Sequence, residues 1–202
     1  VGFWIVEWAG VLADKSLADS FLISFFQAVT SRTAGFNTIE VGDLALHTLV
    51  FMAVLMAIGA KPVSTAGGIK TVPLAVLLLA LRAMIMRRDR VEVFGKTLPA
   101  RTLVTALSVC VLYVAAAIAG IFFLTVFDGN LPLRDLTFEA ISALSTVGLS
   151  TGITADLSTP GRLVLCVLMF LGRVGPISLV LSVFQARKQV EYEYPEAEVV
   201  VG

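Results

Sequence analysis

Long apolar runs dominate the chain, and one of them is uninterrupted whereas two are broken in the middle. Residues 103–127 carry no charge and exceed the roughly 20 residues that a helix needs to cross about 30 Å of hydrocarbon. This run predicts a transmembrane helix. Residues 47–86 are interrupted at 61–70 (KPVSTAGGIK), and residues 163–184 at 172–176 (GRVGP). Both interruptions place helix-breaking residues at the depth of a membrane.

Two shorter segments, residues 17–30 and 133–145, are amphipathic and of helical length but too short to cross a bilayer. Each precedes a stretch of small residues. Non-helical backbone inside a membrane is tolerated where it is buried in protein or lines a water-filled cavity. We therefore predict two re-entrant half-helices, which enter the membrane and turn back.

An internal repeat relates these segments. Residues 26–30 (FQAVT) resemble 138–142 (FEAIS), and residues 33–36 (TAGF) resemble 146–149 (TVGL). An Asp-Leu pair, beginning at Asp43 and at Asp156, closes each copy. Searching for such periodicity before assigning a fold prevents a wrong architecture. The repeat has the order spanning helix, half-helix, Thr-x-Gly turn, spanning helix.

The repeat predicts two units. Residues 1–101 form one, with most of its first helix missing and its second helix broken by an intramembrane loop at about 59–70. Residues 102–202 form the other, together with a cytoplasmic C-terminal tail. Residues 1–10 resemble the end of an apolar helix, so we expect further chain upstream. The predicted fold class is an all-α membrane protein.

Composition and charge agree with a multi-pass protein of the lipid bilayer. Of 202 residues, 57% are hydrophobic and 15% charged, which is more apolar than ordinary soluble domains. The formal net charge is zero, so no basic surface indicates a nucleic-acid partner. Basic residues mark the expected cytoplasmic loops: Arg82, Arg87, Arg88, Arg90, Lys96, Arg101, Arg187 and Lys188. Acidic residues lie on the opposite side, where they would attract cations.

The paired Thr-x-Gly turns predict an ion filter. Gly35 and Gly148 permit backbone conformations that direct successive carbonyl oxygens toward one axis, where they can replace the hydration shell of a cation. The half-helix before each turn would point the negative end of its dipole at the same place. One Thr-x-Gly tripeptide would indicate an ordinary loop. Two in matching contexts favour a filter.

Arg173 and the break at 64–70 are candidate gating elements. A guanidinium near the middle of an apolar helix costs about 2.5–3.5 kcal/mol on insertion scales, so a role facing the pore or binding a loop is favoured over a snorkelling side chain. The small residues Ser64–Gly68 suit an unwound, mobile stretch. A gate below the filter and a tightly packed kink explain this stretch equally well.

Two enzyme-like motifs fail on their context. Residues 148–152 match the Gly-x-Ser-x-Gly nucleophile elbow, but the strand-turn-helix pattern and a nearby histidine base are missing, since His47 is the only histidine. Residues 67–71 lack the glycine that a phosphate-binding loop places before its lysine. We therefore expect no enzyme. A secondary transporter of another solute stays open, because such proteins also use broken helices.

Four ordered motifs resemble the Ktr/Trk/HKT superfamily of potassium transporters: residues 31–37 (SRTAGFN), 64–71 (STAGGIKT), 145–152 (STVGLSTG) and 169–176 (MFLGRVGP). The closing residues, from Tyr194 onward, look like the tail of the bacterial Ktr membrane subunit. One departure is the loop start, where Lys61 and Pro62 replace the small residues usual in the family.

The resemblance implies four helix, pore-helix, helix repeats around one pore, of which this chain would hold the third and the fourth. It implies potassium as the transported ion, sodium as a second candidate ion, a homodimer, a cytosolic nucleotide-binding ring as partner, the missing N-terminal half, and the bacterial inner membrane as location. Potassium would bind backbone carbonyls near Gly35 and Gly148. The implied filter is Thr33, Ala34, Gly35, Phe36, Thr146, Val147, Gly148 and Leu149. The implied gate is Ser64, Thr65, Ala66, Gly67, Gly68, Lys70 and Arg173.

Overall fold

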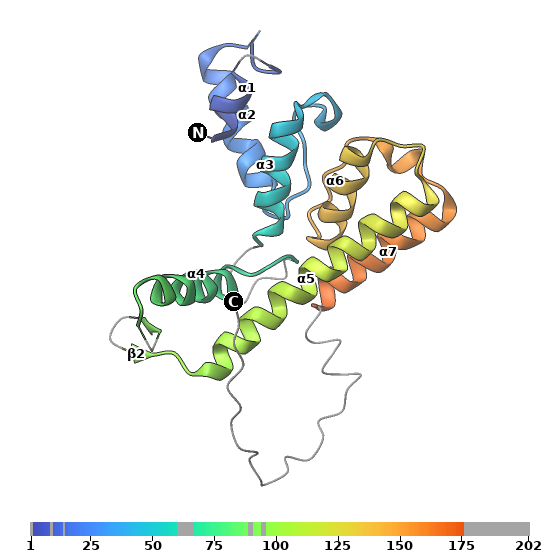
Figure 1. Ribbon diagram of the computed structural model, residues 1–202. Coiled ribbons are helices and arrows are strands. Elements are labelled where there is room, and N and C mark those ends of the chain that lie inside the picture. The colour runs from blue at the N-terminus through green and yellow to red at the C-terminus, as the bar shows by residue number, and fades with distance from the viewer. Residues whose placement is uncertain are drawn as a thin grey trace.

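A computed structural model describes most of the chain, namely residues 2–8, 10–13, 15–59, 67–88, 91–93 and 96–175. Within these ranges the protein consists of seven α-helices, two short 3₁₀ turns and one hairpin of two-residue strands (Figure 1). The prediction of an all-α fold is confirmed. The same order of half-helix, turn, 3₁₀ turn and helix occurs twice.

The longest helix, α5 (Ala100–Phe127), is the first helix of the second copy. It is the one helix in the described ranges that is long and apolar enough to cross a membrane. At about 1.5 Å per residue its 28 residues extend roughly 42 Å. The sequence predicted this helix within three residues of its start. Pro99 precedes it, where a residue without an amide hydrogen costs no helical hydrogen bond.

Helices α6 (Leu133–Leu144) and α7 (Thr159–Val174) pack against the C-terminal half of α5 (Figure 1). A core of apolar side chains from all three helices, including Leu124, Leu144 and Leu168, lies between them. Most of α6 is buried on several faces, although it is short. Such burial is expected of a helix in the interior of a protein rather than of a surface helix.

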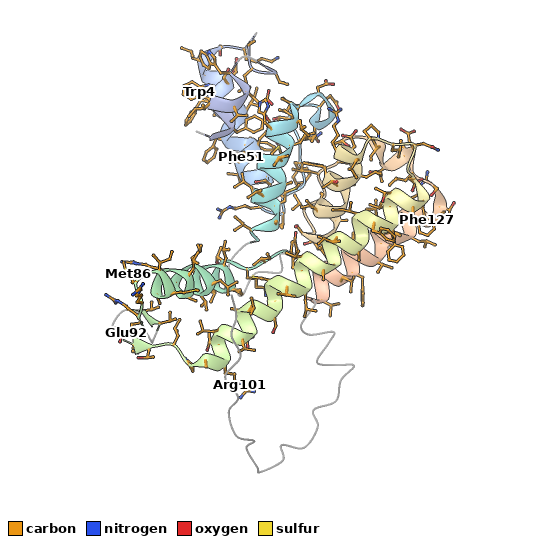
Figure 2. The ribbon with its side chains drawn as sticks, in the orientation of Figure 1. Trp4, Phe51, Met86, Glu92, Arg101 and Phe127 are labelled. Carbon is orange, nitrogen blue, oxygen red and sulfur yellow. The ribbon has the colours of Figure 1, made fainter. Side chains whose placement is uncertain are left out.

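The first copy consists of α1 (Gly2–Glu7), α2 (Leu17–Thr30), the 3₁₀ turn η1 (Val41–Asp43) and α3 (Leu46–Ala57). Trp4 and Phe51, labelled in Figure 2, pack against its core. This core also includes Phe138 of α6 and Val147. The two copies are therefore joined by packing around α6 and the turn that follows it.

The third helix of the first copy, counting the half-helix, is broken. Helix α3 ends at Ala57, and α4 (Thr71–Ile85) begins after an interval of 13 residues. Ile58 and Ile69 form an isolated parallel bridge, with Gly59 N donating to Ile69 O at 2.9 Å. The bridge brings both ends of the interval together, and we name this interval loop 58–70. Of these, residues 60–66 lie outside the described residues.

Beyond the loop, α4 packs against the N-terminal half of α5 (Figure 1). The connection between them carries the hairpin of β1 (Glu92–Val93) and β2 (Lys96–Thr97), which pair antiparallel.

In the second copy, the 3₁₀ turn η2 (Ile153–Ala155) precedes α7 as η1 precedes α3.

The position expected for Arg173 needs a correction. From the sequence it was expected near the middle of an apolar helix spanning 163–184. Helix α7 instead begins at Thr159 and ends at Val174, with Gly175 at φ 84° after it, so Arg173 lies in the last turn. Glycine at this position accepts a left-handed backbone that stops the helix. Residues 176–184 lie outside the described residues.

Candidate functional site

The two Thr-x-Gly turns share an unusual backbone conformation. Thr33 and Gly35 have φ of 69° and 75°, and Thr146 and Gly148 have φ of 55° and 91°. Ala34 and Val147, between them, have ordinary negative φ. Such alternation of handedness turns successive peptide groups so that like atoms face the same side. An arrangement of this kind lets either the N–H groups or the carbonyl oxygens of neighbouring residues face one point.

A positive φ is uncommon for a β-branched residue and is a genuine outlier. Each such residue costs of order 1–3 kcal/mol and persists only where its surroundings hold it. Thr33 and Thr146 occupy equivalent places in the two copies and are both in this region. The same strained conformation therefore recurs at matching positions of the two copies.

The first turn is held by the end of α2. Ala34 N donates to Thr30 O at 3.2 Å, and the Thr30 hydroxyl donates to the Phe36 carbonyl oxygen. Ser31 Oγ donates to Ala28 O at 2.8 Å. These bonds attach both arms of the turn to the last helical turn of α2.

The second turn is held by α6 from one side and by α5 from another. Val147 N donates to Ser142 O at 3.0 Å. Ser145, which is fully buried, shares a hydrogen bond of 2.7 Å between its hydroxyl and that of Tyr113 on α5. Tyr113 was not among the residues predicted from the sequence. A tyrosine in an otherwise apolar spanning helix was the available signal, because a buried phenol normally finds a partner.

A buried carboxylate supports the segment that follows the second turn. Glu139 accepts hydrogen bonds from the Ser150 hydroxyl, from Thr151 N at 3.1 Å and from Thr154 Oγ1 at 3.2 Å. The equivalent residue of the first copy is Gln27, which is fully buried and has no hydrogen-bond partner for its amide group among the described residues. The two copies are thus chemically unequal behind their turns.

The two turns lie side by side. A methyl group added at Gly35 would come within 2.5 Å of the Val147 carbonyl oxygen and 3.6 Å of the Gly148 Cα. One added at Gly148 would lie 3.7 Å from the Gly35 Cα. Separations below 3 Å cannot be accommodated without a shift. Glycine is therefore required at Gly35 for close approach as well as for its positive φ.

Loop 58–70 and helix α7 both reach the base of the second turn. Gly67 N donates to Thr146 Oγ1 at 2.9 Å, and a methyl group at Gly67 would lie 2.8 Å from Ser145 O. From the other side, a methyl group at Gly172 would lie 1.9 Å from Leu144 O. The residues selected from separate motifs therefore meet at the end of α6.

The remaining gate candidates divide into described and undescribed residues. Gly68 has φ of 80°, and Lys70 is the N-cap residue of α4. Arg173 is exposed but borders the same cavity as the second turn. Ser64, Thr65 and Ala66 lie outside the described residues.

A cavity of about 520 Å³ opens beside the second turn. Thr146, Val147, Gly148 and Leu149 all line it, together with Glu139 and Arg173. It therefore brings an acidic group and a guanidinium together with the strained turn. No group of three or more His, Cys, Asp or Glu side chains suited to a metal occurs in the part of the chain that the structure describes.

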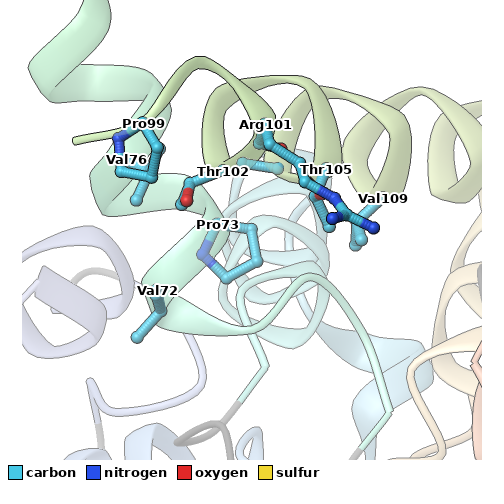
Figure 3. A pocket seen from close by; sticks show the side chains of 9 residues that line it. Val72, Pro73, Val76, Pro99, Arg101, Thr102, Thr105 and Val109 are labelled. Carbon is cyan, nitrogen blue, oxygen red and sulfur yellow. The ribbon is translucent and has the colours of Figure 1, made fainter. Parts of the chain in front are cut away.

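A second cavity, of about 440 Å³, lies between α4 and the start of α5. Figure 3 shows Val72 and Pro73 on α4 opposite Thr102 and Thr105 on α5. This lining contains neither strained backbone nor an acidic group. Its lining does not match a cation path, whereas the cavity beside the second turn adjoins an acidic group and strained backbone.

Known proteins provide an independent comparison. The sequence profile of the TrkH family, described as a cation transport protein, matches residues 2–192. The Ktr system potassium uptake protein B of Bacillus subtilis (strain 168) is 37% identical over 201 residues, which cover 98% of this chain and 45% of that protein. The potassium/sodium uptake protein NtpJ of Enterococcus hirae is 34% identical, over 99% of this chain and 46% of that protein.

A solved structure shares the fold. The crystal structure of the potassium transporter TrkH from Vibrio parahaemolyticus superposes with a TM-score of 0.76 at 22% sequence identity. The superposition covers 91% of this chain and 41% of that one. The chain thus spans less than half the length of these similar proteins.

Proposed function

The chain belongs to the TrkH family of cation transport proteins, and on that premise we propose that it forms part of a potassium-conducting pore. The two Thr-x-Gly turns would supply two segments of a filter built from backbone carbonyls. The observation that carries the proposal is the matched pair of positive φ values in two turns lying side by side. Backbone strain of this kind is not expected to recur at matching positions of two ordinary loops.

In the proposed filter, ions bind carbonyl oxygens of Thr33 to Phe36 and of Thr146 to Leu149. A cation that leaves water loses its hydration shell, and a ring of fixed carbonyl dipoles replaces it. The C-terminal ends of α2 and α6 adjoin the turns, so both helix dipoles add negative potential there. Potassium is the proposed main ion. Sodium is the proposed second ion, because the similar NtpJ of Enterococcus hirae is named a potassium/sodium uptake protein.

The proposed gate is loop 58–70 together with Arg173. Support comes from the hydrogen bond of Gly67 to Thr146 and from the position of Arg173 on the same cavity as the turn. A loop bound to the inner end of a filter would obstruct ions leaving it. A guanidinium nearby would add an electrostatic barrier to cations. Movement of either element would then admit flux.

Two repeats supply only two segments of the proposed filter, so the complete pore requires further protein. We assign residues 1–101 and 102–202 as the third and fourth pore repeats, and the first two to an N-terminal half that completes the ring. We further propose a homodimer in the bacterial inner membrane, bound to a cytosolic nucleotide-binding ring. The lengths of the similar proteins support the additional half.

The proposal is tested by cation uptake into cells that lack other potassium uptake, with the protein expressed at its natural full length. We expect the wild type to take up rubidium, a potassium analogue, in preference to sodium. Gly148→Ser would lower that preference about tenfold or more, because a side chain at φ 91° displaces the carbonyls by strain.

The matched control is Gly152→Ser. Gly152 also has a positive φ, of 100°, but a Cβ there meets no atom within 4 Å, and it follows the turn. Gly152→Ser should therefore keep the selectivity of the wild type. If Gly148→Ser and Gly152→Ser have the same selectivity, the proposed filter is refuted. Uptake of a larger solute with no cation preference would instead favour a secondary transporter.

A further inference from the structure

Each copy contains a buried carboxylate where its first helix ends. Glu7 is the last residue of α1 and is 1% exposed, and Asp128 follows the last residue of α5 and is 7% exposed. A buried carboxylate is costly unless hydrogen-bond donors compensate it. The hydrogen-bond donors to these two carboxylates therefore show which elements each carboxylate connects.

Both carboxylates bind the start of the third helix of their own copy. Glu7 Oε1 accepts from Ala45 N at 3.3 Å and from the Thr48 hydroxyl. Asp128 accepts from Ser158 N at 2.7 Å and from Ser158 Oγ at 3.0 Å. Ala45 and Ser158 are the N-cap residues of α3 and α7. We call these two sets of contacts the clasps.

The clasps recur although the residue types differ between copies. A helix start leaves backbone N–H groups without helical partners and carries a partial positive charge, so an anion there is favourable. Glycine makes room for the carboxylate in each case. A methyl group at Gly10 would lie 2.2 Å from Glu7 Oε2, and one at Gly161 would lie 1.9 Å from Asp128 Oδ2.

The clasps have the same relation to the turns. Ala45 lies ten residues after Gly35, and Ser158 lies ten residues after Gly148. The start of each turn is bound to its half-helix. The clasp fixes the far end of the segment that leaves the turn. A strained turn persists only while its surroundings hold it, so both attachments are needed.

We propose that Glu7 and Asp128 are positioning residues of the ion filter, which hold the third helix of each copy to the first and thereby keep the strained Thr-x-Gly turns in register. This inference rests on the proposed filter function. Neither residue touches the ion. Their effect passes through the ten-residue segments between each turn and its clasp.

The inference predicts a loss of selectivity that accompanies clasp disruption. In the full-length protein, Asp128→Ala should lower the rubidium-to-sodium uptake ratio, normalised to the amount in the membrane, by about threefold or more. In Asp128→Asn the uptake ratio should fall less, because the amide oxygen of the asparagine still accepts from Ser158 N and its NH₂ group can donate to Ser158 Oγ. Gly161→Ala should also lower the ratio, since the added methyl displaces the carboxylate without removing it.

Asp156→Ala is the matched control, because Asp156 is an exposed carboxylate of the same connecting segment and should leave the ratio unchanged. Glu7→Gln and Glu7→Ala test the first copy in the same way. Clasp variants that reach the membrane with the wild-type ratio would overturn the inference. So would a series in which every clasp variant fails to reach the membrane, since that assigns the carboxylates to folding alone. A wild type without cation selectivity would instead refute the filter.

Discussion

At the scale of single residues, the strained threonines and their supports are the central feature. Thr33 and Thr146 hold positive φ values that an isolated peptide would avoid. The sequence predicted the Thr-x-Gly pairs from their spacing, and it could not predict what holds them. Tyr113 lies 32 residues from Ser145, so only the packing of α5 on α6 brings their hydroxyls together.

This contact gives a prediction at the residue scale. Tyr113→Phe should destabilise the purified protein by about 1–3 kcal/mol, because it leaves the buried Ser145 hydroxyl without its partner. Thermal unfolding in detergent measures the effect. The double variant Tyr113→Phe with Ser145→Ala should be less destabilised than the sum of the single variants, because neither hydroxyl then lacks a partner.

Ser108→Ala provides the control for this cycle. Ser108 is also on α5, but its hydroxyl binds the Val104 carbonyl of its own helix at 2.8 Å in an exposed place. Its loss should change stability by about 0.5 kcal/mol or less. Strictly additive effects of Tyr113 and Ser145 would show that the two hydroxyls do not depend on each other.

At the scale of elements, the helix boundaries follow from local sequence. The half-helices α2 and α6 agree with their predicted ranges, because short amphipathic segments with defined ends carry that information themselves. Ser16, for example, caps α2 by accepting from Asp19 N at 3.2 Å. The end of α7 differs from the prediction, because the helix ends at Val174 with Gly175 after it, whereas the apolar run of the sequence extends further.

The loop and the arginine give a prediction at this scale. Deleting residues 64–68 removes the Gly67 amide that binds Thr146, and Arg173→Gln removes a positive charge beside the cavity. Either change should raise the rubidium uptake rate about two- to tenfold, the effect of losing one or two modest interactions. Initial uptake rates, normalised to membrane abundance, measure this.

Arg162→Gln is the control for the charge. Arg162 is an exposed arginine on the same helix, and its guanidinium binds the Ala155 carbonyl at 2.8 Å near η2. Its replacement should leave the rate near the wild-type value. Unchanged or slower uptake in both gate variants would rule out the loop and the arginine as a barrier.

At the scale of the whole molecule, apolar side chains cover much of the surface. Ile118, Phe122 and Val126 on α5, and Leu163 and Phe170 on α7, are each at least 59% exposed. Soluble monomers rarely expose contiguous apolar patches of this extent. Lipid or further protein must cover these faces, in agreement with the membrane location of the family.

The orientation gives a prediction at this scale. In a background with Cys110 and Cys166 replaced by alanine, Asn130→Cys should react with a membrane-impermeant maleimide in intact cells. Arg101→Cys should react only after permeabilisation, because the basic loops are expected in the cytoplasm. Both positions are exposed. The reverse pattern would invert the proposed direction of the pore.

The sequence by itself determined the membrane class, the helical segments, the internal repeat and the paired Thr-x-Gly turns. Each of these depends on composition or on spacing within one segment, so a single chain displays them directly. The tertiary structure alone decided which segments meet. The bond of Gly67 to Thr146 spans 79 residues, and the clasps of Glu7 and Asp128 span about 30 to 40. Contacts at such separations form only when helices pack, because packing sets the distances between residues far apart in the chain.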